Sequence, residues 1–194
     1  MNRLFAPVCL LIFLFAAPIC LAQTSTAPNS KIDGNKWEEF TLPNGQFVVS
    51  MPGKPTSQTI PLNSNGETFV AHILGFDKED ESYAVGYLEF PNRVDDSTKA
   101  KSFFDQLADK EVSKVGGKLI SQTDIEITGY RGREVTMEVA DGFWVDRFYL
   151  VGRRIYFISA FAAKTSSAAK EITTEQNALI RKYLESFKLK LEPH

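Results

Sequence analysis

Cysteine is almost absent from this 194-residue chain. Its two cysteines, Cys9 and Cys20, both lie in an N-terminal segment that we expect to be removed. The remainder, from Gln23 onward, has no thiol, which excludes a disulfide, a cysteine nucleophile and a zinc site built on thiolates. A domain of this size buries enough apolar surface to fold without a disulfide.

Histidine is equally scarce, with only His72 and His194. His194 is the last residue, and His72 lies in a predicted strand. Hydrolytic triads usually need a histidine base, and a metal site built on imidazole needs several ligands at set spacings. We therefore predict no catalytic residue and no metal site, and we do not expect an enzyme.

Sequence patterns for cofactors and ions are also lacking. Gly116-Gly117-Lys118 follows a predicted helix, whereas a phosphate-binding loop opens one. The acidic segment 77–81 has neither the spacing nor the glycine of an EF-hand loop, which favours a solvated loop. We expect no cofactor. A pair of carboxylates brought together by the fold stays an open alternative, because such pairs have no fixed spacing.

Neither sign of charge is in large excess: 24 acidic and 22 basic residues give a net charge of −2. Nucleic-acid-binding domains usually carry a strongly basic face, so no nucleic-acid partner is predicted. The hydrophobic content of 43% is ordinary for a globular protein, and the length fits one domain.

The first 22 residues have the pattern of a secretory signal peptide. Arg3 is followed by the apolar run 10–17, and Cys20-Leu21-Ala22 supplies small residues for cleavage after Ala22. The alternative is an uncleaved anchor, but the apolar run is shorter than the ~20 residues that span a bilayer, and Pro7 and Pro18 interrupt the segment. We predict a secreted or periplasmic protein with no stable membrane span after cleavage.

Residues 23–36 are rich in Ser, Thr, Pro and Asn and nearly free of apolar residues. This composition is typical of a flexible linker. The folded domain is predicted to begin at Trp37 and to extend to Leu191.

Three consecutive strands are predicted within residues 127–161. Asp141-Gly142 and Gly152-Arg153 separate apolar-rich runs, and Asp-Gly favours a type I′ turn, in which both central residues have positive φ. The middle run, 143–151, is apolar on both faces. A strand covered on both faces lies inside a sheet, so we expect a central strand with other elements packed on each side.

The rest of the domain is predicted to supply further strands and two helices. The helices are Ser97–Val115, ended by Gly116-Gly117, and Thr174–Phe187, which has a capping-box spacing at Thr173 and Gln176. The strands are Trp37–Leu42, Phe47–Met51, Ser57–Leu62, Glu67–Phe76, Ser82–Phe90, Lys118–Ile127 and a short edge strand at Lys188–Leu191. This order predicts a single α+β domain with a mostly antiparallel sheet covered by helices on one or both faces.

Four arginines gather near the turns of the three-strand unit: Arg131, Arg133, Arg153 and Arg154. Arginines at such positions are more often edge and turn charges, which discourage sheets from aggregating edge to edge. The alternative is that the four form a patch for an anion or a protein partner.

The segments Phe47–Pro55, Gly116–Leu119, Gly129–Glu134 and Arg147–Tyr156 together resemble small exported bacterial proteins of the PsbP-like group. The likeness extends from about Trp37 to Leu191 and implies an antiparallel sheet sandwiched between helices, an α/β/α sandwich. Relatives with this fold include the extrinsic PsbP subunit of photosystem II and a Ran-binding nuclear-import factor, which bind proteins. Arg131 stands where the motif usually has a small turn residue or proline. The matching positions are turns and core, so no functional residue carries over.

Two functions are consistent with these observations. The first is an exported non-catalytic binding or accessory domain of the cell envelope, with an envelope protein as its partner and no particular oligomeric state indicated. The alternative is a small-ligand-binding protein or hydrolase that uses carboxylates or arginine in a cleft. A deep pocket with several converging polar groups would favour the alternative.

Overall fold

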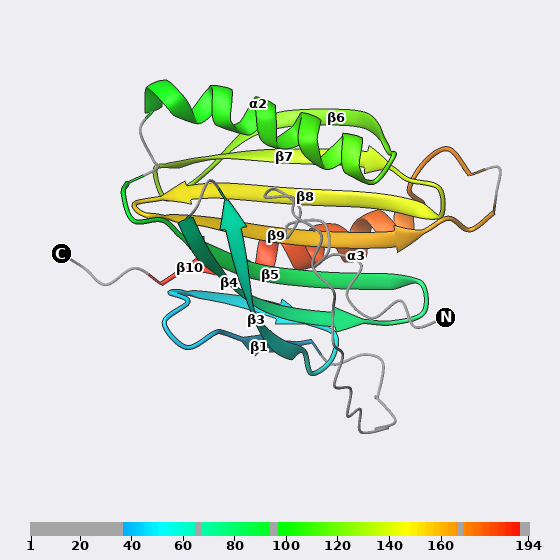
Figure 1. Ribbon diagram of the computed structural model, residues 1–194. Coiled ribbons are helices and arrows are strands. Elements are labelled where there is room, and N and C mark those ends of the chain that lie inside the picture. Colours follow the sequence, from blue (N-terminus) through cyan, green and yellow to red (C-terminus); the bar gives the residue numbers. More distant parts are fainter. Residues whose placement is uncertain (1–36, 65–66, 94–96, 167–168, 191–194) are drawn as a thin grey trace.

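A seven-stranded antiparallel sheet is the frame of the computed structural model, which describes residues 37–64, 67–93, 97–166 and 169–190 (Figure 1). The predicted signal peptide (1–22) and linker (23–36) lie outside the described residues. The strand order is β3-β4-β5-β9-β8-β7-β6. The strands are β3 (Thr56–Ser64), β4 (Glu67–Asp77), β5 (Glu81–Glu89), β6 (Lys118–Ile127), β7 (Tyr130–Glu138), β8 (Gly142–Val151) and β9 (Arg154–Ala163).

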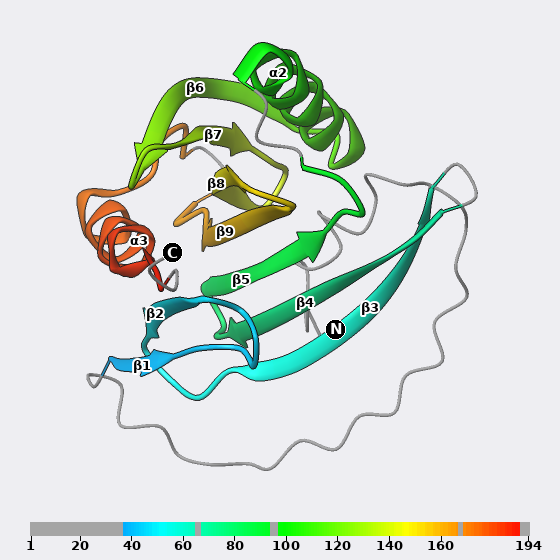
Figure 2. The same cartoon turned by 90° about the vertical axis from the view of Figure 1, so that its left-hand side faces the viewer.

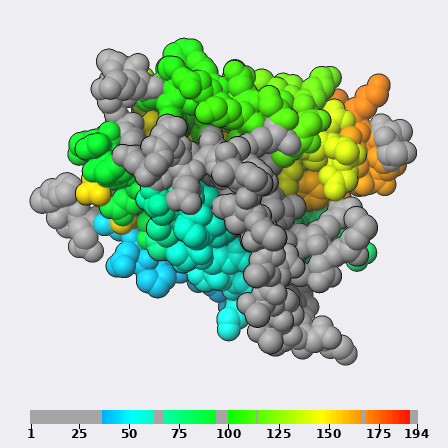
Figure 3. Space-filling model, in the orientation of Figure 1, coloured from blue at the N-terminus to red at the C-terminus, as the bar shows by residue number. Residues whose placement is uncertain are grey.

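The first helix, α2 (Ser97–Lys114), covers one face of the sheet over β6 and β7 (Figure 2). Its buried stripe includes Ala100, Phe104 and Leu107, which are spaced one helical turn apart as an amphipathic helix requires. In the space-filling view α2 forms the upper surface of the molecule (Figure 3). Gly116 follows the helix with a φ of 57°, which confirms the predicted left-handed C-cap.

The second helix, α3 (Thr174–Ser186), packs on the opposite face, against β9 and the small sheet (Figure 2). Its predicted capping box is present. The Gln176 amide donates to Thr173 Oγ1 at 3.2 Å, and the Thr173 amide donates to Gln176 Oε1 at 3.1 Å. The apolar face of α3 consists of Ile180, Tyr183 and Leu184, all buried.

A small three-stranded sheet completes the α3 face. It consists of β1 (Glu38–Phe40), β2 (Phe47–Met51) and β10 (Lys188–Leu189), with β2 in the middle. Phe187, just after α3, packs against Phe47 of β2 with 5.5 Å between the ring centroids. A mostly antiparallel sheet with helices on both faces confirms the predicted α+β fold class. Neither described helix is long and apolar enough to cross a lipid bilayer.

The strand β8 is buried on both faces, as the sequence predicted. It lies between β7 and β9, and β9 holds the middle position of the seven strands. Since side chains alternate along a strand, Trp144 and Phe148 enter the core cluster on the α2 face, whereas Val145 and Tyr149 enter the cluster on the α3 face. Two separate apolar cores therefore meet at this strand.

The turn between β7 and β8 differs from the prediction. Neither Asp141 nor Gly142 has a positive φ, so the predicted type I′ turn at this pair is wrong. Gly142 is the first residue of β8, and its carbonyl accepts a hydrogen bond from the Val139 amide at 2.9 Å. Positive φ values instead occur together at Thr128 and Gly129, between β6 and β7. The predicted turn at Gly152-Arg153 is confirmed.

Candidate functional site

Two of the four predicted arginines meet around one glutamate at the β8–β9 turn. Arg154 donates to Glu89 Oε2 from Nε and Nη2 at 3.2 and 3.1 Å, and Arg153 Nη2 lies 3.5 Å from Glu89 Oε1. Arg154 Nη1 also donates to the Asn44 carbonyl at 2.7 Å, so it ties the β1–β2 loop to the main sheet. Arg153 is more exposed and donates to the Phe90 carbonyl at 2.9 Å.

The other two arginines are placed differently. Arg133 is only 4% exposed and lies on the α2 face of β7. It donates to Asp124 at 2.7 Å and to Asp105 at 3.0 Å, and it also donates to Gln122 at 2.9 Å. Arg133 therefore joins β7, β6 and α2. Arg131 is exposed near the beginning of β7. The structure thus brings together Arg153 and Arg154 but puts Arg133 on the other face of the sheet.

The one described histidine, His72, lies beside these arginines on the α3 face. Its ring stacks on Tyr87 with 4.9 Å between centroids, and its Nδ1 lies 3.4 Å from Thr59 Oγ1. The Arg154 guanidinium lies 4.6 Å from the centroid of the same Tyr87 ring. Burial raises the pKa of Tyr87, and the Arg154 charge partly opposes this rise. The arrangement is a cation–aromatic stack across three strands.

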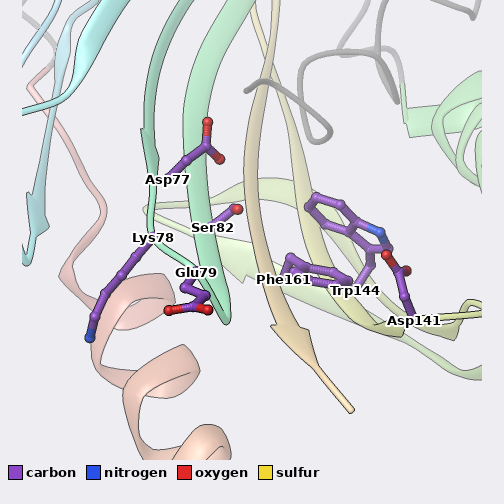
Figure 4. Close-up of a pocket in the computed structure, with 7 residues that line it drawn as sticks. All are labelled: Asp77, Lys78, Glu79, Ser82, Asp141, Trp144 and Phe161. Carbon is purple, nitrogen blue, oxygen red and sulfur yellow. The ribbon is translucent and has the colours of Figure 1, made fainter. Parts of the chain in front are cut away.

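A small cavity of about 80 Å³ opens at the end of the β4–β5 hairpin (Figure 4). Figure 4 shows Ser82 beside Asp77 and the Asp141 carboxylate beside the Trp144 ring, while Lys78 points away from the rings. The cavity is lined by Asp77, Lys78, Glu79, Ser82, Asp141, Trp144 and Phe161. Pockets for drug-sized ligands usually measure ~300–1,000 Å³. No group of three or more acidic, histidine or cysteine side chains in the described part of the chain could hold a metal ion.

Sequence reasoning did not identify an ion network beneath α3. Arg147 Nε and Arg181 Nη1 both donate to Glu134 Oε2, at 2.7 and 2.8 Å. Arg147 also donates to the Leu184 carbonyl at 3.2 Å. Burial works to raise the pKa of Glu134, but the hydrogen bonds from Arg181 and Arg147 outweigh it and hold that pKa below its ordinary value. The network joins β7, β8 and α3.

Sequence reasoning also did not identify a buried acid on the α2 face. Asp146 of β8 is fully buried, as is Ser159, which faces it on β9. Burial raises the pKa of Asp146 to about 7, and the nearby Ser159 hydroxyl partly opposes this rise. The one sequence signal was an acidic residue within the apolar run 143–151.

A solved structure shares this fold. The chain is similar to the solution structure of cyanobacterial PsbP (CyanoP) from Synechocystis sp. PCC 6803, with a TM-score of 0.54 and 11% sequence identity. The match covers 86% of this chain and 98% of that chain. The fold is therefore PsbP-like, as the sequence resemblance implied, and at this identity the likeness concerns the fold alone. No protein-family model and no curated protein matches the sequence.

Proposed function

We propose that this protein is an exported, non-catalytic binding or accessory domain of the cell envelope. The observation that carries the proposal is the use of three buried or half-buried charged side chains. Arg133, Arg147 and Glu134 each join separate elements of the fold. Because these charged groups bind one another or the backbone, they stabilise the fold. We therefore expect the functional residues to lie at the surface.

The geometry around His72 and the cavity supports binding over catalysis. A histidine base in a triad is oriented by an acid on its other ring nitrogen, whereas the hydrogen bond found for His72 is to the exposed Thr59 hydroxyl and its ring is stacked on Tyr87. The cavity near Trp144 is well below the usual volume of a substrate pocket. Both features favour a protein partner over the alternative of a small-ligand-binding protein or hydrolase.

The partner surface that we propose lies at one end of the sheet. The antiparallel register places the beginning of β7 and the β8–β9 turn at the same end. Arg131 and Arg153 are both exposed there. Arginine is enriched at protein interfaces and binds carboxylates in a bidentate manner, so the fitting partner is an envelope protein with an acidic surface.

Export is tested by N-terminal sequencing of the tagged chain recovered from a bacterial envelope fraction. The expected mature chain begins at Gln23. The variant Ile12→Arg, which places a charge in the apolar run 10–17, is expected to remain full-length in the cytoplasm. Recovery of the unaltered chain with an intact N-terminus would contradict the export proposal.

Partner binding is tested by co-purification with Arg131→Glu and Arg153→Glu variants as bait. The matched control is Lys110→Glu, which reverses an exposed charge on α2. The acidic partner is expected to bind the unaltered chain and the control, and to be lost from both arginine variants. Equal recovery with all four baits would place the partner elsewhere, and a hydrolytic activity of the purified chain would favour the alternative function.

A further inference from the structure

Two buried polar side chains face each other on the α2 face of the sheet. Asp146 on β8 and Ser159 on β9 are direct cross-strand partners, and neither side chain is exposed to solvent. None of the described residues forms a hydrogen bond of good geometry with either Asp146 oxygen or with Ser159 Oγ. The hydroxyl is near enough to lower the carboxyl pKa in part.

The surroundings of Asp146 are largely apolar. Val135 is its neighbour on β7, and Trp144 and Phe148 lie two residues away on the same face of β8. A buried ionised carboxylate costs several kcal/mol unless it is paired with a cation or fully hydrogen-bonded. Asp146 is therefore either protonated and neutral, or ionised at a cost to the stability of the fold.

Among the residues that the structure describes, the charged and titratable groups near this face do not supply Asp146 with a counter-charge. Arg133 on β7 is engaged by Asp105 of α2 and by Asp124 of β6. Glu111, which is fully buried, lies on the sheet-facing stripe of α2 and has the same sign as Asp146. From the α3 side, the Tyr183 hydroxyl donates to the Ala84 carbonyl at 2.6 Å.

Two further charged groups also do not pair with Asp146. Arg147, the next residue along β8, points to the α3 face and pairs with Glu134. Asp77 lies farther along the α2 face, opposite Ser82 on β5, and carries the same sign as Asp146.

We propose that Asp146 and Ser159 form a proton-binding switch in the core: the fold holds Asp146 as the neutral acid, and loss of its proton weakens the packing of α2 on the sheet. A neutral carboxyl buries no charge, whereas an ionised one would have only the Ser159 hydroxyl nearby as a donor. An ionised Asp146 would lie on the same face of the sheet as Glu111, a second buried acid, and none of the ion pairs found among the described residues would neutralise it.

The direction of the pH effect follows from linkage. The pKa of Asp146 is raised in the folded chain, from an ordinary value of 3.8 to about 7. Between these values the folded chain binds more protons than the unfolded chain, so stability falls as pH rises. The stabilising effect of the proton is complete below the pKa that Asp146 has in the unfolded chain, and it is gone above the pKa that Asp146 has in the folded chain. Export, as proposed above, then links the stability of this domain to the pH outside the cell.

The test is chemical unfolding of the purified chain at pH 5 and at pH 8, compared with Asp146→Asn. The variant keeps the shape of the side chain without its titration. From pH 5 to pH 8 the folding equilibrium constant of the unaltered chain is expected to fall on the order of 100-fold relative to the variant. A relative fall of less than tenfold would overturn the proposal.

A second variant keeps the proposal testable if Asp146→Asn does not fold. Ser159→Ala removes the hydroxyl that lowers the carboxyl pKa, so the loss of stability is expected to move to higher pH. An unchanged pH profile in Ser159→Ala would contradict the paired switch. Hydrogen exchange, corrected for its intrinsic pH dependence, locates the effect: amides of residues 104–112 in α2 are expected to lose protection at pH 8 in the unaltered chain.

Discussion

Gly142 lies so close to Ala162 on the neighbouring strand that no side chain fits between them. A carbon atom added to Gly142 would overlap the Ala162 carbonyl oxygen and the Phe161 ring. The residue has no positive φ. The glycine is therefore required by the close approach of β8 and β9, and the conformation of the turn does not require it.

Replacement of Gly142 should consequently destabilise the fold whatever the turn preference of the new residue. We expect Gly142→Ala to cost about 1–3 kcal/mol in unfolding free energy, as overpacking does, and Gly142→Asn to cost more because the side chain is larger. Urea unfolding measures both. The control is Gly129→Asn, at a φ of 85° with open space around it, where asparagine should be tolerated. A tolerated Gly142→Asn would show that the turn sets the requirement.

Two aromatic side chains of β8 allow a direct test of the core on the α2 face. Trp144 is 4% exposed and Phe148 is 1% exposed, so truncation of either to alanine should cost about 3–5 kcal/mol. Ile120→Ala is the matched control, since Ile120 is 48% exposed on the edge strand and should cost less than about 1 kcal/mol. A loss below about 1 kcal/mol at Phe148 would mean that the α2 face of β8 is open to solvent.

Much of this fold could be predicted because its signals are local. The apolar run 143–151 and the glycine after α2 depend on neighbouring residues, and the elements that they predicted are present. The turn at Asp141-Gly142 was predicted wrongly because the same glycine serves a contact with β9 that lies 20 residues farther on. Turn propensity and close packing favour the same residue, and only the strand pairing distinguishes them.

The candidate sites were less predictable because they depend on distant pairings. Alternation puts Arg131 and Arg133 on one face of β7, but only the position of α2 explains why Arg133 is buried and Arg131 is exposed. The Asp146–Ser159 pair likewise requires the β8–β9 register. Nothing in the sequence around Glu134 indicates that Arg181, 47 residues away, will bind it.

The Glu134 network predicts a loss of stability in acid. Arg181 and Arg147 hold the pKa of Glu134 below its ordinary value. The ionised Glu134 therefore stabilises the fold above the pKa that this group has in the unfolded chain, and this stabilisation is lost as pH falls through its pKa in the folded chain. At pH 7 we expect Glu134→Gln to cost about 1–3 kcal/mol. Unfolding curves from pH 6 to pH 3 should show the difference between the unaltered chain and the variant shrinking. A difference that stays constant down to pH 3 would rule out a charge-dependent role.

Arg154 is expected to matter for the β1–β2 loop, and its neighbour Arg153 is the natural control. The Arg154 side chain is 17% exposed, against 53% for Arg153. Arg154 stacks on Tyr87 and donates to Glu89 and to the Asn44 carbonyl. Lysine keeps the charge but lacks the planar fork that makes these bonds together.

We therefore expect Arg154→Lys to lower the unfolding free energy by about 1–3 kcal/mol, since hydrogen bonds to charged groups and a stacked cation are lost together. The Lys190 amide should also exchange faster with solvent, because it donates to the Gln46 carbonyl at the end of the same loop. Arg153→Lys should change the unfolding free energy by less than about 1 kcal/mol. Equal effects of the two variants would mean that the charge at this turn matters and the geometry of Arg154 does not.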